Sequence, residues 1–264
     1  MLKVRWPAVA GLFYPDNPKK LRSLVEEYLR AVRVTGSAPK AIIVPHAGYI
    51  FSGPVAASAY ALFLPLQGLV ERVVILGPSH RVPLRGLAMS TADTFATPLG
   101  QIPVDHEAWS LISDLPQVSL MDRPHLQEHS LEVQLPFLQE VLGDFRLVPL
   151  VVGDAGPAEV AEVMERLWGG PESRFVISSD LSHYHDYLTA KRLDQSTSQA
   201  IAELRPQDID YEDACGRIPV QGLLEAARRH ALVPRVLDLR NSGDTAGPRD
   251  QVVGYGAYAF EEAA

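Results

Sequence analysis

The sequence predicts an α/β fold in which helices flank a mainly parallel central sheet. Three short apolar runs carry this prediction: Ala41–Val44, Val73–Leu76 and Phe175–Ile177. They are rich in β-branched residues, as is typical of strands buried on both faces of a parallel sheet. Segments with helical spacing alternate with such runs, which indicates βαβ units. We therefore expect a single domain over residues 1–264.

The individual elements follow from local signals. Asn17 and Pro18 predict a helix start, because a capping side chain precedes a proline in the first turn. Proline at position 157 opens a second helix, with apolar residues on one of its faces. The expected helices are 18–33, about 53–64, about 105–114, about 128–141, one beginning at 157, about 187–204 and 219–230. The expected strands are 40–45, 72–77, short strands within 84–104, 145–152, 174–179, 234–240 and 251–260.

The composition is that of an ordinary globular protein, with 264 residues, 47% hydrophobic and 21% charged. A net charge of −8 disfavours nucleic-acid binding, which usually requires a basic surface. No apolar run has the length of a membrane span, and the N-terminus makes a poor signal peptide. The single cysteine, Cys215, excludes an internal disulfide and a zinc site built from several cysteines. We expect a cytoplasmic protein.

Three histidines lie just past the apolar runs. His46 follows the first run, His80 the second and His183 the third. The ligand site of an open α/β sheet lies beyond the carboxyl ends of its strands, so these imidazoles should meet at one edge. Imidazole is the commonest metal ligand and also transfers protons near neutral pH. The pattern predicts a metal-binding or acid–base centre, although each histidine alone could equally serve a turn.

Asp180 stands three residues before His183. Its carboxylate could fix the tautomer of the imidazole, whose free nitrogen would then move a proton. Both residues could instead be metal ligands or belong to a surface turn. The spacing leaves these alternatives open.

Two further segments offer carboxylates. Glu128 and His129 open a predicted helix, where the carboxylate would cap the helix unless the preceding loop folds over the sheet edge. Asp244 lies in a glycine-containing turn before the last strand and would reach the same edge. Two histidines and a carboxylate form the facial triad of non-haem Fe(II) oxygenases, and with a bound water they also serve Zn²⁺ in hydrolysis. A serine nucleophile is disfavoured because no Gly-x-Ser-x-Gly elbow is present.

Several motifs together resemble the Memo family (mediator of cell motility), whose microbial members are also called AmmeMemoRadiSam system protein B. The resemblance runs nearly end to end. Its motifs are Phe13-Tyr14-Pro15, Val44-Pro45-His46-Ala47-Gly48-Tyr49, Ser52-Gly53, Gly77-Pro78-Ser79-His80, Glu128-His129-Ser130-Leu131-Glu132, Ser178-Ser179-Asp180-Leu181-Ser182-His183 and Cys215-Gly216-Arg217.

The resemblance implies a fold similar to class III extradiol ring-cleavage dioxygenases, whose non-haem iron is held by two histidines and a carboxylate. His46 and His80 match the histidine ligands, and His183 matches the histidine that acts as acid and base. Some Memo proteins have a cysteine before the final strand, but the corresponding segment here has none. Asp244 is therefore the expected third ligand. Cys215 belongs to a separate motif and is expected to be packed and inert.

The preferred interpretation is an Fe(II)-dependent oxidoreductase, with copper or zinc as other metals. Asp180 would orient His183, while Glu128, His129 and Tyr49 would contact a substrate, either a small molecule or a peptide. The resemblance also implies partnership with AMMECR-type and radical-SAM proteins. One alternative is a non-catalytic adaptor that binds a peptide or a phosphorylated ligand in the same cleft. A second alternative is a metal-dependent hydrolase.

Overall fold

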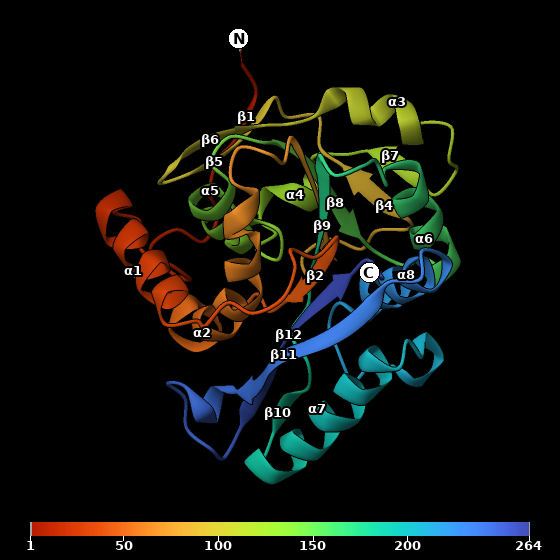
Figure 1. Cartoon of the computed structure of the whole chain (residues 1–264). Helices are drawn as coiled ribbons and strands as arrows, with labels where there is room; N and C mark the ends of the chain where they lie inside the picture. Colours follow the sequence, from red (N-terminus) through yellow and green to blue (C-terminus); the bar gives the residue numbers. More distant parts are fainter. Residues whose placement is uncertain (1, 264) are drawn as a thin grey trace.

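A nine-stranded sheet runs through the centre of the computed structural model, which describes residues 2–263 (Figure 1). The strand order is β10-β12-β2-β9-β3-β8-β4-β7, and β11, which lies off this path, pairs antiparallel with β12. The strands of this sheet are β2 (Ala41–Val44), β3 (Arg72–Pro78), β4 (Leu87–Met89), β7 (Val118–Leu120), β8 (Arg146–Val152), β9 (Ser173–Ser178), β10 (His183–His185), β11 (Val233–Asn241) and β12 (Val252–Glu261). The expected α/β architecture is confirmed. The domain expected over 1–264 also includes Met1 and Ala264, which lie outside the described residues.

The four central strands of the sheet are parallel, and the edge strand β7 is also parallel to its neighbour β4. The strands β2, β9, β3 and β8 run in one direction, and every residue of β2 and β9 is buried. On the two flanks, β12 and β4 run antiparallel to their inner neighbours, so the sheet as a whole is mixed. Burial on both faces explains why the central strands read as apolar runs.

Helices cover both faces of the sheet. On one face, α1 (Pro18–Arg30), α2 (Tyr49–Tyr60) and α5 (Leu135–Leu142) pack together, and on the other α6 (Pro157–Arg166) packs against α8 (Arg217–Arg229) (Figure 1). The helix α7 (Tyr187–Ala202) packs on β11 and β12. The start of α1 is capped as expected, because the Asn17 side chain accepts hydrogen bonds from the Lys19 and Lys20 N–H groups, both at 3.1 Å.

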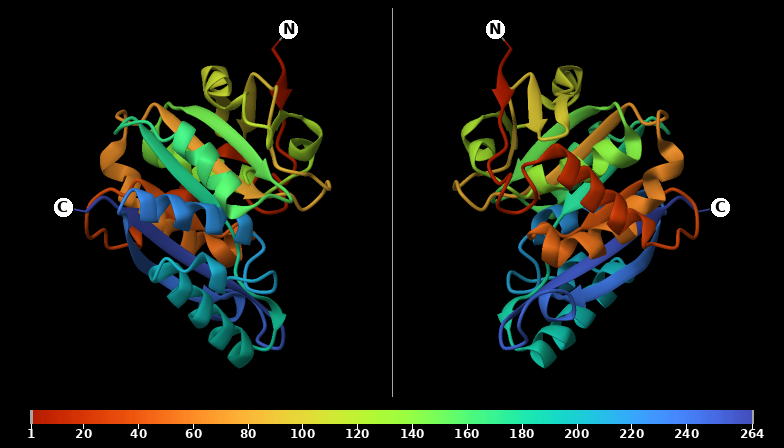
Figure 2. Two further views of the ribbon diagram at one scale, coloured as in Figure 1. Left: turned by 90° about the vertical axis from the view of Figure 1, so that its right-hand side faces the viewer. Right: turned by 90° about the vertical axis from the view of Figure 1, so that its left-hand side faces the viewer.

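A small sheet closes one end of the molecule. Its strands are β1 (Val4–Arg5), β5 (Thr94–Thr97) and β6 (Gly100–Pro103), and Figure 2 shows it at the N-terminal end, away from α7. The helix expected over 105–114 is there as a 3₁₀ turn, His106–Ala108, followed by the short α3, Trp109–Ile112.

The helix expected over 128–141 is interrupted, and this prediction is wrong in its first half. The short α4 (Arg123–Leu126) ends before Glu128, a 3₁₀ turn covers Glu132–Gln134, and α5 begins only at Leu135. Pro136 occupies the first turn of α5, which is the only helical position that tolerates proline without losing a hydrogen bond. The segment around Glu128 is therefore free to fold over the sheet edge.

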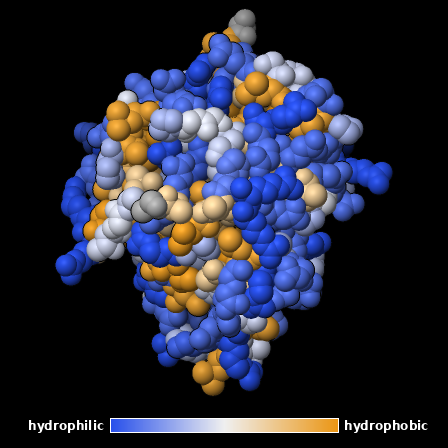
Figure 3. Space-filling model, turned by 45° about the vertical axis from the view of Figure 1, so that its right-hand side comes forward, coloured by the Kyte–Doolittle hydropathy of each residue, from blue (hydrophilic) through white to orange (hydrophobic). Residues whose placement is uncertain are grey.

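The helical segment Tyr49–Leu66 includes α2 and a following 3₁₀ helix, Ala61–Leu66. It is the one described segment that is long and apolar enough to cross a membrane, but 67% of it is buried inside the fold. Burial to this extent is typical of a helix that belongs to the core of a folded domain. The outer surface in Figure 3 is mostly hydrophilic, with apolar side chains gathered in separate patches.

A buried ion pair fastens the N-terminal segment to the core. The Glu132 carboxylate is fully buried and pairs with the equally buried Arg5 guanidinium. It also accepts hydrogen bonds from the Ala8 N–H at 2.7 Å, the Val9 N–H at 3.0 Å and the Tyr14 hydroxyl at 2.6 Å. Removing its charge would leave the Arg5 cation buried without a counter-charge, although two backbone carbonyls would still accept its hydrogen bonds.

We expect Glu132→Gln to lower the free energy of unfolding by about 3–5 kcal/mol, the usual effect of breaking a buried ion pair from one side. Urea denaturation followed by circular dichroism measures this. Glu26→Gln is the matched control, because it removes a partner of Arg30 from an exposed helical pair and should cost less than about 1 kcal/mol. Equal, small losses in the two variants would show that the buried network does not hold the N-terminal segment.

Candidate metal centre

Three neighbouring parallel strands end at one edge of the sheet. Because β9 lies between β2 and β3, the residues that follow these strands are brought together. The ring centroids of His46 and His80 are 5.1 Å apart. Both rings line a cleft of about 960 Å³, and His129, Asp180, His183 and Cys215 line the same cleft. This volume is typical of a small-molecule site.

The tautomer of His46 is set by Ser178, the last residue of β9. The Ser178 hydroxyl donates to the Ser130 carbonyl at 2.6 Å, so it must accept from the His46 Nδ1–H, which lies 2.9 Å away. His46 Nε2 therefore carries the free lone pair. The ring is buried, with 2% of its surface exposed, which holds this nitrogen rigidly at the floor of the cleft.

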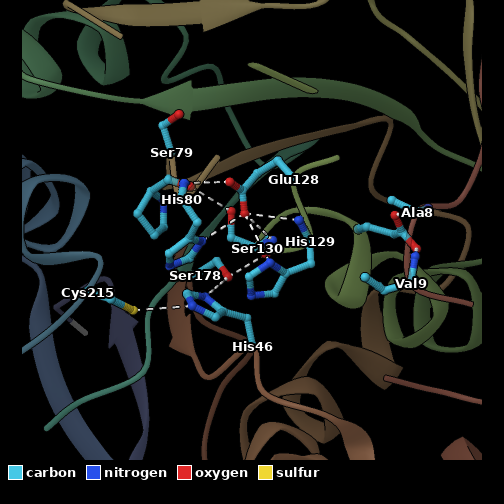
Figure 4. A network of polar contacts seen from close by, with 12 residues as sticks. Ala8, Val9, His46, Ser79, His80, Glu128, His129, Ser130, Ser178 and Cys215 are labelled. Atoms are coloured by element: carbon cyan, nitrogen blue, oxygen red, sulfur yellow. Dashed lines mark hydrogen bonds and ion pairs between the residues drawn. The ribbon is translucent and has the colours of Figure 1, made fainter. Parts of the chain in front are cut away.

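The tautomer of His80 is set in the same way by Glu128. One carboxylate oxygen accepts from the His80 Nδ1–H at 2.9 Å, and the other accepts from the His80 backbone N–H at 2.6 Å. The backbone N–H groups of His129 and Ser130 also donate to this carboxylate, at 3.0 and 2.9 Å (Figure 4). A carboxylate behind an imidazole is the usual support of a metal-ligating histidine, because it orients the ring and raises the basicity of Nε2.

The hydrogen bonds around Glu128 also fix its own charge. Burial alone would raise its pKa, but the hydrogen bond and charge of His80, together with the backbone N–H groups, lower the pKa to about 2. Glu128 is therefore ionised at neutral pH. It neither caps a helix nor lines the cleft, so its place is behind His80 rather than against a substrate.

Cys215 completes the group of donor atoms. Its Sγ lies 3.2 Å from His46 Nε2, and Figure 4 shows the sulfur pointing at that ring from the side opposite Glu128. The candidate ligand atoms of His46, His80 and Cys215 all lie within 4.8 Å of one another. The same limit holds for His80, Glu128 and His129, but Glu128 there already accepts hydrogen bonds.

A glycine brings Cys215 to this position. Gly216 is the N-cap residue of α8, and its N–H donates to the Ser179 hydroxyl at 2.9 Å. A Cβ on Gly216 would lie 2.6 Å from Ser179 Cβ and 2.7 Å from the Ser178 carbonyl oxygen. Only glycine lets the start of α8 approach the end of β9 this closely.

Burial dominates the electrostatics of the centre. It lowers the pKa of His46 well below the usual value, with the nearby His80 adding to the effect, and lowers the pKa of His129 to about 4. Burial also raises the pKa of Cys215, helped by the charge of Asp180, and raises the pKa of Asp180 itself. At neutral pH His46 and His129 are thus neutral, the form in which imidazole ligates metals.

Asp180 and His183 both line the cleft, but they are not a hydrogen-bonded pair among the described contacts. The Asp180 carboxylate accepts from the backbone N–H of His46 at 2.7 Å, and its second oxygen lies 4.0 Å from His46 Nε2. His183 begins β10, where its backbone pairs with Val253. Asp180 therefore positions His46, in place of the expected contact with His183.

The fourth histidine of the cleft, His129, packs against both candidate ligands. Its ring stacks on His80 with centroids 4.7 Å apart and meets His46 edge-on at 5.4 Å. Its Nδ1 is buried without a hydrogen-bond partner and lies 3.4 Å from a Glu128 oxygen. The structure thus places His129 inside the cleft, where a substrate contact was expected.

Two expected site residues lie elsewhere. The Asp244 carboxylate accepts from the Tyr187 hydroxyl at 2.6 Å and from the Asn241 N–H at 3.1 Å, so it caps its own 3₁₀ turn instead of joining the histidines. Tyr49 is 3% exposed, and its hydroxyl donates to the Val133 carbonyl at 2.6 Å in the core. The structure therefore contradicts the expected placement of both residues.

Cys215 is the donor that the sequence interpretation set aside. In its motif the cysteine is followed by a glycine at the start of a helix. A glycine at such a position indicates that the backbone packs closely against a neighbouring segment, and this much is visible in the sequence. What the sequence does not show is that α8 begins against the end of β9. Cys215 is thus the residue that the structure puts in the place expected for Asp244.

Comparisons with known proteins agree with the motifs. The family model described as "Memo-like protein" matches residues 5–259. A MEMO1 family protein of Aeropyrum pernix is 39% identical, covering 97% of this chain and 99% of its own length. Related proteins of Aquifex aeolicus and Saccharolobus solfataricus are 36% and 35% identical, and each covers at least 96% of this chain and 98% of its own length.

Among solved structures, an uncharacterized protein of Escherichia coli K12, JW3007, is similar with a TM-score of 0.52 at 13% identity. The match covers 83% of this chain and 98% of that one, and at this identity it supports the fold alone. The family model and the near-full-length relatives confirm the resemblance drawn from the motifs. The chain belongs to the Memo family.

Proposed function

We propose that this protein is a metal-dependent oxidoreductase whose iron or copper ion binds to His46, His80 and Cys215. The observation that carries the proposal is the convergence of these three donors, all within 4.8 Å of one another, in one cleft. Both imidazoles have their Nδ1 atoms occupied by hydrogen bonds, so both Nε2 atoms are left as the acceptor nitrogens, and that of His46 faces the Cys215 thiol at 3.2 Å. Hydrogen bonds that orient two neighbouring imidazoles through Nδ1 are a feature of metal centres.

The donor set fits a first-row transition metal. Imidazole suits iron, copper and zinc, whereas a thiolate favours softer ions such as Cu(I). Burial keeps the Cys215 thiol protonated in the absence of a cation, and a bound cation would favour the thiolate. Fe(II) stays the first metal to test from the family resemblance, and the thiolate makes copper the second.

A bound redox metal would supply one-electron chemistry and an electrophilic position for substrate oxygen. The chain's own groups would do the rest. Asp180 fixes the backbone of His46, and both residues are buried at the inner end of the cleft. His183 lines the same cleft without a hydrogen bond to Asp180, which leaves its imidazole free to take or give a proton.

Cys215→Ser should lower the affinity for Fe(II) or Cu(I) by about tenfold or more, because the thiolate is the one soft donor of the set. Asp244→Asn is the matched control and should leave the affinity unchanged, since the Asp244 carboxylate is bound to Tyr187 and Asn241. Anaerobic competition titrations against a chromogenic chelator measure both affinities. If Asp244→Asn lowered the affinity and Cys215→Ser did not, Asp244 and not Cys215 would be the third metal ligand.

Glu128→Gln should lower the metal affinity by about 10- to 100-fold, the usual effect of losing the support behind a ligating histidine. The carboxylate accepts from four N–H groups, and an amide would turn its own NH₂ group toward some of them. The same titration measures the loss, and circular dichroism checks the fold. Unchanged affinity would show that the orientation of His80 does not depend on Glu128.

His183→Ala should keep its metal while oxygen consumption falls by about 10²- to 10⁴-fold, the range expected for a general acid or base. Oxygen uptake by anaerobically loaded protein, assayed with a panel of catechols, tests this. His185→Ala is the control, because His185 lies on the same strand but does not line the cleft. If metal-loaded wild-type protein consumed no oxygen, the oxidoreductase proposal would be wrong and a binding role would be favoured.

A further inference from the structure

We propose that the cleft selects neutral or cationic ligands with an apolar, aromatic body and discriminates against carboxylates and phosphates. This inference rests on the proposed function in treating the cleft as a substrate site, and it narrows the class of substrate. It also separates the enzyme reading from an adaptor that holds a phosphorylated ligand.

The charges of the cleft carry the first step. Within residues 2–263, no lysine or arginine lines it, whereas Asp180 and Glu212 do. Proteins hold carboxylates and phosphates mainly with arginine, lysine or free backbone N–H groups. The guanidinium of Arg217 lies 5.9 Å from the Tyr211 ring centroid but does not line the cleft.

Two backbone N–H groups at the helix starts beside the cleft are already used in hydrogen bonds. The Tyr49 N–H at the start of α2 donates to the Phe13 carbonyl at 2.8 Å. The Gly216 N–H at the start of α8 donates to Ser179. These N–H groups are taken, so an anion would have to give up its hydration without receiving these donors in return.

A bound divalent ion would not make the cleft cationic. The Cys215 thiolate would offset part of its charge, and the lining holds the carboxyl groups of Asp180 and Glu212 beside it. A ligand that reaches the metal through a neutral oxygen or nitrogen would meet no repulsion there. A ligand with a distal carboxylate would face Asp180 and Glu212 without a counter-charge.

Apolar and aromatic side chains surround the mouth of the cleft. Leu12, Ile50, Tyr184 and Tyr211 line it, although 80%, 64%, 72% and 77% of their respective surfaces are exposed. Isolated exposed apolar residues are ordinary, but a group of them around one opening marks a binding surface. Two of the four are tyrosines, whose rings stack on flat apolar molecules.

The backbone holds Tyr184 in a strained conformation at this mouth. Its φ of 61° lies in the left-handed region, which bulky residues rarely adopt, and it sits between His183 and His185 where the pairing of β10 with β12 shifts. The Tyr184 ring is 5.8 Å from the His183 ring. Strain of this kind is retained mainly at functional positions, and here it sets an aromatic ring beside the candidate proton-transfer group.

Three size-matched phenols test the charge selection: 4-ethylphenol, tyramine and 4-hydroxyphenylacetate, which carry no charge, a positive charge and a negative charge. The full chain is treated with EDTA and titrated with each phenol at pH 8 by calorimetry and NMR. We expect 4-ethylphenol and tyramine to bind, and 4-hydroxyphenylacetate to bind at least about fivefold more weakly, because it meets two carboxylates without a cation.

Variants locate the effect. Glu212→Gln should reduce the affinity for tyramine by about two- to fivefold, the usual size of an exposed charge contact, and leave 4-ethylphenol unaffected. Glu27→Gln, an exposed glutamate of α1 that does not line the cleft, is the matched control. Tyr211→Ala and Tyr184→Asn should weaken all three phenols by about threefold or more. Asparagine tolerates the left-handed conformation, so the second variant removes the ring without adding strain.

The proposal is overturned if 4-hydroxyphenylacetate binds as tightly as 4-ethylphenol, if none of the phenols binds saturably, or if neither tyrosine variant changes the affinities. The same titrations on metal-loaded protein report separately on the metal centre. If the protein bound no metal, the oxidoreductase proposal would be wrong. The affinities of the three phenols for metal-free protein would still test the charge selection independently.

Discussion

The position of β9 between β2 and β3 is the constraint on which the candidate centre depends. Parallel pairing sets His46, His80 and Asp180 beyond the same edge, and a slip of one residue would turn the strand side chains to the opposite face. The last residue of β9, Ser178, takes part directly, because its hydroxyl links His46 Nδ1 to the Ser130 carbonyl. The register of β9 therefore fixes the position of the Ser178 hydroxyl, and this hydroxyl fixes the tautomer of His46.

The polar groups around the centre form a closed network inside an apolar core. Glu128 accepts four N–H groups, and Ser178 also receives the Gln134 amide at 2.9 Å. Satisfied networks of this kind are rigid, since any movement would leave a buried polar atom unpaired. The exception is the buried Nδ1 of His129, which has no hydrogen-bond partner. The His129 ring is therefore held in the cleft by packing against His46 and His80.

The sequence allowed the architecture and the two histidines to be predicted, because buried strands leave a direct mark in apolar runs and the site follows their ends. It did not allow Cys215 to be placed. That placement depends on a contact between Gly216 and Ser179, 37 positions apart, and on a missing Cβ that no periodicity reveals. Asp244 was misplaced for the opposite reason, since its carboxylate satisfies nearby N–H and hydroxyl donors before it could reach the edge. The role of Glu128 behind His80 could not be predicted either, because it depends on α5 beginning at Leu135 and not at Glu128.

The route of the chain through the centre has a thermodynamic consequence. His46 and Cys215 touch although they are 169 positions apart, so most of the polypeptide lies in the loop between them. An ion shared by the two would act as a reversible cross-link, and closing a long loop removes much of the freedom of the unfolded chain. Since the unfolded chain presents no assembled site, occupancy would also favour the folded state by mass action. Cellular supply of the metal would then regulate how long the protein survives, in addition to whether it works.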